Sequence, residues 1–236
     1  LFWPDRKGIG LKQVQAALAA RDTTAADAAG LAGKSVAMQG LGALEFVLHG
    51  TGADALTAAA DPYRCAYGRA VAGNVEQIAA DVARAWDRPD GFAAVWEAPG
   101  PDNAVYRDGS EAVTELVGAF IEGLDIVRDV RVKGFLGRQA GADRPKQAIY
   151  WRSGATAASL AAGLAGMDAL FQASKLAEAL PQDDRWIAQS IHIQFVNGAS
   201  TARQAAGPID AVLADPERRA LLEHFSLITS SLSNLF

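Results

Sequence analysis

The stretch MQGLGALEFVLHG, residues 38 to 50, holds the residues whose types and spacing are best suited to chemistry. Glu45 stands there in an otherwise apolar helical pattern, and His49 follows it by four residues. Side chains four residues apart lie on one face of a helix, so a carboxylate and an imidazole at this spacing could share a metal ion. A carboxylate buried without a partner is costly. Glu45 is therefore expected either at a solvated edge or held for a purpose.

Two arginines that directly precede expected helices, Arg6 and Arg152, are the candidate partners of Glu45. A guanidinium facing the carboxylate would keep it charged and could orient a carboxylate-bearing or metal-chelated ligand. A partner from the other half of the chain would place the pair between domains, where ligand sites tend to form. Ser153 follows Arg152 and is expected to cap the next helix.

The elements that position these residues are expected to be helices. Half of the 236 residues are hydrophobic with Ala dominant, and Val, Ile and Thr form no alternating runs, which predicts an all-α fold. One helix is expected from Ser35 to Gly50, and the breaker-rich stretch 89–109 is expected to contain none. Further helix starts are predicted at Asp61-Pro62, Ser110 and Asp215-Pro216.

Two apolar stripes predict bundle packing. The first follows the Asp61-Pro62 start and consists of Tyr67, Val71, Val75, Ile78, Val82 and Trp86. The second follows Ser110 and includes Phe120, Leu124, Val127 and Val130. We predict two packed helical-bundle domains, residues 1–120 and 121–236, which a duplication could have produced.

Composition and missing motifs exclude several classes. The net charge of −5 without a basic patch argues against nucleic-acid binding, and no apolar run reaches the length of a membrane span. The zinc-protease sequence H-E-x-x-H, the P-loop, the dinucleotide fingerprint and G-x-S-x-G are all absent. His49, His192 and His224 are far apart, so a histidine-rich metal site would need several helices.

Three stretches resemble the imelysin family, whose motif is G-x-H-x-x-E on a helix followed by an aliphatic run and a glycine. Gly40 and Glu45 match that motif and FVLHG matches its tail, whereas the histidine position holds Gly42. FWPDRKGIG and YWRSGATAASLAAGLAGMDALF resemble the lead-ins to the family's first and second helical domains.

The resemblance implies a bacterial protein of the periplasm or cell surface, often lipid-anchored, with two helical bundles and a link to iron uptake. The family is named for an insulin-cleaving metallopeptidase. Both ends of the chain look trimmed, so a lipid anchor is expected in a missing N-terminal segment.

These observations predict a non-catalytic binding component linked to iron acquisition, with a site between the two bundles. The expected ligand-binding residues are Glu45, Arg152, Ser153, Gln39 and Asp5, with Glu45 and His49 as metal candidates. No catalytic residue is assigned, and the cofactor stays open, with a divalent metal or iron as candidates. The expected partners are a small ligand or metal ion and iron-uptake proteins of the envelope.

Two alternatives remain open. A metallopeptidase usually needs at least three protein ligands, so His192 or His224 would have to lie near Glu45. A helical scaffold without a small-molecule site would leave Glu45 exposed.

Overall fold

The computed structural model describes residues 5, 7–57 and 60–236, and throughout these residues the chain forms helices and no strand. The predicted all-α fold is confirmed. The chain folds into two compact units, Leu1–Glu115 and Leu116–Phe236, and each unit has its own apolar core. The predicted domains, 1–120 and 121–236, stay a prediction. None of the described helices is both long and apolar enough to cross a membrane.

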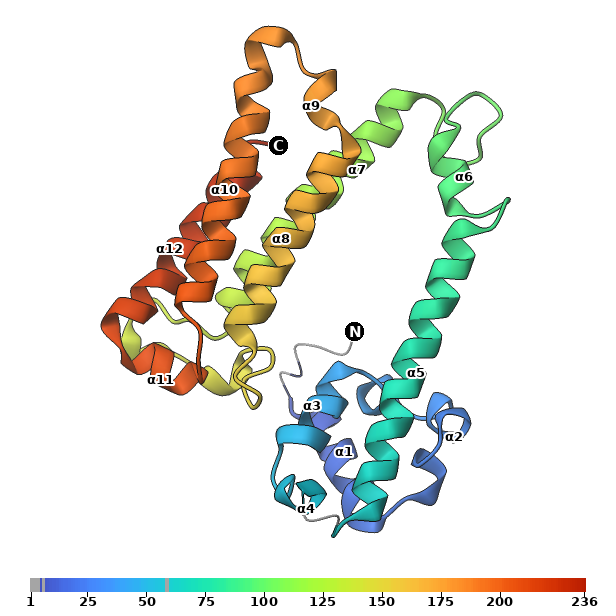
Figure 1. Cartoon of the computed structure of the whole chain (residues 1–236), viewed down its shortest axis with the longest axis vertical. Helices are drawn as coiled ribbons and strands as arrows, with labels where there is room; N and C mark the ends of the chain where they lie inside the picture. The colour runs from blue at the N-terminus through green and yellow to red at the C-terminus, as the bar shows by residue number, and fades with distance from the viewer. Residues whose placement is uncertain (1–4, 6, 58–59) are drawn as a thin grey trace. The chain divides into compact units, whose positions relative to one another are not determined.

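The first unit is built on the long helix α5 (Pro62–Asp87), with short helices packed around its N-terminal half (Figure 1). The Asp61 carboxylate caps α5 by accepting a hydrogen bond of 3.1 Å from the Arg64 amide, and Pro62 fills the first turn as predicted. The other elements of this unit are α1 (Ile9–Ala20), η1 (Thr23–Ala25), α2 (Ala28–Ala32), η2 (Val36–Met38), α3 (Leu41–His49), α4 (Asp54–Thr57) and α6 (Phe92–Glu97).

Only the first half of the α5 stripe enters the core. Tyr67 and Val71 are fully buried, whereas Ile78, Val82 and Trp86 are 50%, 63% and 48% exposed. The predicted packing along the whole stripe is therefore wrong for its second half. The physical reason is that the helices α1 to α4 are short and gather where α5 begins (Figure 1).

The stretch 89–109 contains a helix, contrary to the prediction. α6 fits between the breakers, because Pro89 and Gly91 precede it and the next proline, Pro99, follows it. The loop after it is closed by Asn103, whose amide nitrogen donates to the Val95 and Ala98 carbonyls at 2.7 and 2.9 Å. The same side chain accepts hydrogen bonds from two backbone amides further on. One asparagine thus replaces several backbone contacts.

The second unit is a helical bundle in which α10 packs against both α8 and α12 (Figure 1). Asp215 and Pro216 begin α12 as predicted, with the Asp215 carboxylate accepting from two amides of the first turn. The elements are α7 (Gly109–Asp125, which begins in the first unit), η3 (Ile126–Val132), η4 (Ala140–Ala142), η5 (Pro145–Gln147), α8 (Thr156–Ser174), α9 (Leu176–Ala179), η6 (Gln182–Asp184), α10 (Arg185–Gln204), α11 (Ile209–Ala214) and α12 (Pro216–Ser233).

The helix that begins as α7 continues as a π-helical segment, η3. Its core positions follow α-helical intervals up to Val127, but the next fully buried residue is Val132, five positions on. Val130, which the periodicity placed on the stripe, is only half-buried. The wider π turn accounts for this shift in register.

A buried ion pair fixes the segment that leads from η3 to α8. Arg219 of α12 donates from Nε to Oδ2 of Asp143 at 2.8 Å and from Nη2 to the Gly137 carbonyl at 2.7 Å. The hydrogen bond to Asp143 raises the pKa of the Arg219 guanidinium. Both side chains are almost fully buried, so removal of Arg219 would leave a buried carboxylate that has lost its cation, and removal of Asp143 would leave Arg219 only the partly exposed carboxylate of Glu223.

Candidate functional site

Glu45 lies in α3, whose Ala43, Phe46 and Val47 enter the core of the first unit. The Glu45 residue itself is only 9% exposed, so it is not the solvated edge residue that the scaffold alternative requires. It is not an unpaired charge either. Burial of a carboxylate costs free energy that its partners must offset, so a buried glutamate on a short helix is a position to test for function.

The predicted continuous helix from Ser35 to Gly50 is wrong, because the chain breaks between η2 and α3. Ser35 caps only the single turn of η2, and Gly40 takes an extended conformation before α3 begins. The Gln39 side chain fills the break. Its amide nitrogen donates to the Lys34 carbonyl at 2.6 Å and to the Ala32 carbonyl at 3.3 Å.

Two side chains of α5 hold the start of the Glu45 helix. The Tyr67 hydroxyl donates to the Met38 carbonyl at 2.9 Å, and burial raises the pKa of this phenol. The Asn74 amide donates to Oε1 of Gln39 at 3.3 Å. Gln39, predicted as a ligand residue, thus has a structural role in linking the turn before α3 to α5.

Arg64 of α5 holds the other end of α3. Its guanidinium donates to the carbonyls of Phe46, Val47 and Thr51 at 2.9, 2.8 and 3.0 Å. Carbonyls at the end of a helix lack partners within the helix, and the negative end of the helix dipole favours a cation. Burial lowers the pKa of Arg64, and nearby carboxylates oppose that shift. Glu45 therefore lies on a helix that α5 fixes at both ends.

Sequence reasoning missed Arg64 and Asn74. Both lie on the buried face of α5: Arg64 is three residues before Tyr67, and Asn74 is three residues after Val71. A cation and an amide on an otherwise apolar stripe are a signal that buried carbonyls or amides must be close. That signal was present in the sequence.

Arg152 and Ser153 lie in a tight turn before α8. Tyr150 has a φ of 56° and Gly154 a φ of 71°, a left-handed conformation that is unusual for a tyrosine. Thr156 is fully buried and donates from its hydroxyl to the Ile149 carbonyl at 2.6 Å, which closes the turn. A non-glycine residue keeps this left-handed conformation only where the surrounding structure holds it there.

Ser153 does not cap α8, contrary to the prediction. The cap residue is Ala155, and the Ser153 hydroxyl instead donates to the Tyr150 carbonyl at 3.1 Å within the turn. Arg152 lies with its guanidinium carbon 4.4 Å from the centre of the Trp151 ring, a cation–π arrangement that orients the side chain. Neither Arg152 nor Ser153 is without further partners.

The likeness to known families extends over nearly the whole chain. The model of the family described as Imelysin matches residues 1–234. The chain belongs to the imelysin family. No curated protein and no solved structure matches it.

In this imelysin-family chain, Gly42 stands three residues before Glu45, in the exposed first turn of α3. A Cβ atom added at Gly42 would meet no other atom within 4 Å. The space around this position therefore does not require a glycine.

The two metal candidates of the imelysin chain, Glu45 and His49, differ in solvent exposure. His49 is exposed in the last turn of α3, where a histidine suits the helix dipole, while Glu45 is buried. Among the residues that the structure describes, no three His, Cys, Asp or Glu side chains gather to hold a metal ion. The metal pair stays a prediction.

The remaining candidates have identifiable surroundings. Asp5 accepts a hydrogen bond of 2.9 Å from the Leu11 amide and so supports the start of α1, whereas Arg6 lies outside the described residues. His192 of α10 contacts Asp168 of α8, with 2.8 Å between Nδ1 and Oδ1. His224 lines a polar hollow of about 350 Å³ between α10 and α12.

Proposed function

We propose that this imelysin-family chain is a non-catalytic binding component of the bacterial envelope, linked to iron acquisition. Its ligand is a small molecule or metal ion, and Glu45 and Arg152 provide the charged groups of the site, which lies between the two helical bundles. Ser153, Gln39 and Asp5 are secondary members. The chain acts in the periplasm or at the cell surface, in contact with other iron-uptake proteins.

The observation that carries the proposal is the buried carboxylate of Glu45 on a helix whose two ends are fixed by α5. Preorganised charge is what a binding site needs, because less conformational freedom is then lost when the ligand binds. Arg152 is similarly oriented by its contact with Trp151 in a strained turn. Gly42, at the motif's histidine position, supports binding without catalysis, because it removes a strong metal ligand.

The test is calorimetric titration of the full chain with ferric citrate and with zinc, together with the metal content of the purified protein. Glu45→Ala and Arg152→Ala should each weaken binding at least about tenfold, since each removes a charge-assisted contact. Glu76→Ala is the matched control, because Glu76 is an exposed carboxylate on α5. Binding by Glu45→Ala equal to that of the wild type would refute the site.

The same samples distinguish the enzyme alternative. Incubation of the zinc-loaded wild type with insulin should leave the peptide intact if the chain only binds. Cleavage that disappears in Glu45→Ala would instead establish the metallopeptidase.

A further inference from the structure

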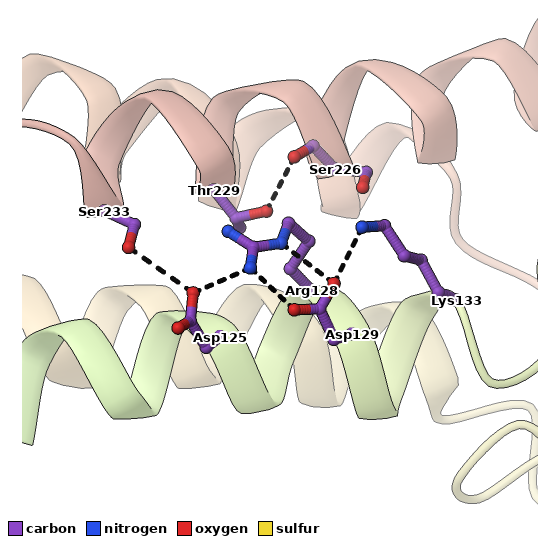
Figure 2. A network of polar contacts seen from close by, with 7 residues as sticks. All are labelled: Asp125, Arg128, Asp129, Lys133, Ser226, Thr229 and Ser233. Carbon is purple, nitrogen blue, oxygen red and sulfur yellow. Dashed lines mark hydrogen bonds and ion pairs between the residues drawn. The ribbon is translucent and has the colours of Figure 1, made fainter.

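Arg131, in the π-helical segment η3, differs in its partners from Arg128 and Arg219, two other arginines of the second unit. Arg128, on the same segment, lies between the carboxylates of Asp125 and Asp129 at 2.8 and 2.6 Å, and Lys133 contacts Asp129 from the other side (Figure 2). Arg219, described above, is likewise paired with two carboxylates. Within the part of the chain that the structure describes, Arg131 has no carboxylate partner and donates to the Ser159 hydroxyl.

The π turn places Arg131 at the edge of the bundle. In an uninterrupted α-helix, position 131 would follow Leu124 by two turns and would enter the core. The wider turn puts Val132 there instead, fully buried, and leaves Arg131 half-buried against α8. π segments of this kind are frequent at functional sites.

Small residues of α8 lie against the guanidinium of Arg131. Ser159 provides the hydroxyl. Gly163 lies one turn further along α8, and a Cβ atom added to it would be 3.4 Å from a guanidinium nitrogen of Arg131. Burial lowers the pKa of Arg131, and Tyr150, at the strained turn before α8, acts on it electrostatically in the opposite direction. The positive charge has therefore lost part of its hydration without gaining a carboxylate, and a bound anion would compensate for that loss.

We propose that Arg131 and Ser159, with Tyr150 beside them, form an oxyanion subsite that binds a carboxylate or phosphate group of a ligand. The guanidinium presents a planar fork that matches two oxygens of either group, and the serine hydroxyl fixes the orientation of the fork. This subsite goes beyond the proposed function, because its residues and its ligand chemistry are independent of Glu45 and of any metal.

The test is calorimetric titration of the full chain with sodium citrate and, separately, with inorganic phosphate at constant ionic strength and without metal. We expect saturable binding of at least one probe, and Arg131→Met should weaken it about tenfold or more. The probe that binds identifies the preferred group. Arg128→Met is the matched control, since it removes the same charge from the same segment and should leave the affinity within about twofold.

Two further variants keep the test decisive if Arg131→Met does not fold. Arg131→Lys keeps the charge but removes the planar guanidinium that can donate to two oxygens at once, and Ser159→Ala removes the hydroxyl that orients it. Each should weaken binding of the probe about threefold or more. The subsite is refuted if the wild type binds neither probe, or if the Arg131 and Ser159 variants bind as tightly as Arg128→Met. Because the probes contain no metal, a failure of the Glu45 experiment leaves this result interpretable.

Discussion

Arg64→Met tests whether α5 fixes the end of the Glu45 helix. The substitution keeps much of the buried aliphatic stem and removes the guanidinium that donates to the carbonyls of Phe46, Val47 and Thr51. A hydrogen bond to a charged group contributes about 1.5–3 kcal/mol to stability. Contributions of neighbouring bonds are not additive, and water can reach part of this helix end, so we expect a total loss of about 3 kcal/mol.

The assay is urea and thermal unfolding of the full chain, followed by circular dichroism. A loss of about 3 kcal/mol corresponds to a decrease of roughly 6–12 °C in the unfolding temperature of a chain of this size. Arg69→Met is the matched control, because Arg69 is exposed on the same helix and its replacement should change stability by less than about 0.5 kcal/mol. Arg64→Lys should fall between the two, since an ammonium group cannot present a fork to three carbonyls.

Equal stability of Arg64→Met and Arg69→Met would refute the reasoning. It would mean that water replaces the guanidinium at the end of α3 without cost. A loss of stability in Arg64→Met with unchanged affinity for ferric citrate and zinc, measured well below the unfolding temperature, would show that Arg64 stabilises the fold without affecting the Glu45 site.

Two predictions concern the metal site and pH. Gly42→His should raise zinc affinity about tenfold or more over Gly42→Ala, because the imidazole would share a helix face with Glu45 and the space is open; equal affinities would count against this geometry. Hydrogen bonds from Thr24 and Lys34 lower the pKa of Asp22 to about 2, so its contribution to stability is present above the ordinary aspartate pKa near 4 and is lost as the pH falls through about 2. Thermal unfolding from about pH 5 to about pH 2 should therefore show the wild type losing its advantage over Asp22→Asn, and a constant difference would contradict the assignment.

The helix starts could be predicted because the chemistry is local. Asp61-Pro62 and Asp215-Pro216 each combine a side-chain acceptor with a residue that fits the first turn, and both begin helices. The same reasoning failed at Ser153. There the turn is closed instead by the buried hydroxyl of Thr156, which donates to the Ile149 carbonyl next to the left-handed residue Tyr150.

The candidate site was only partly predictable. Glu45 was chosen as a candidate because a carboxylate in an apolar stripe is conspicuous, and the structure shows that it is buried. The residues that position it were harder to find, since Arg64 and Asn74 act through backbone carbonyls and an amide 13 to 35 positions away along the chain. The register of η3 was not predictable either, because periodicity assumes one helical pitch throughout.

The π-helical segment also bears on how this chain changes in evolution. A π turn is equivalent to one residue inserted into an α-helix, and the helix absorbs it by widening. Loss of one residue between Val127 and Val132 would restore the four-residue interval of an ordinary helix, with both valines still in the core. The segment Ile126–Val132 is therefore a place where relatives can differ in length by one residue while the packing on either side is preserved.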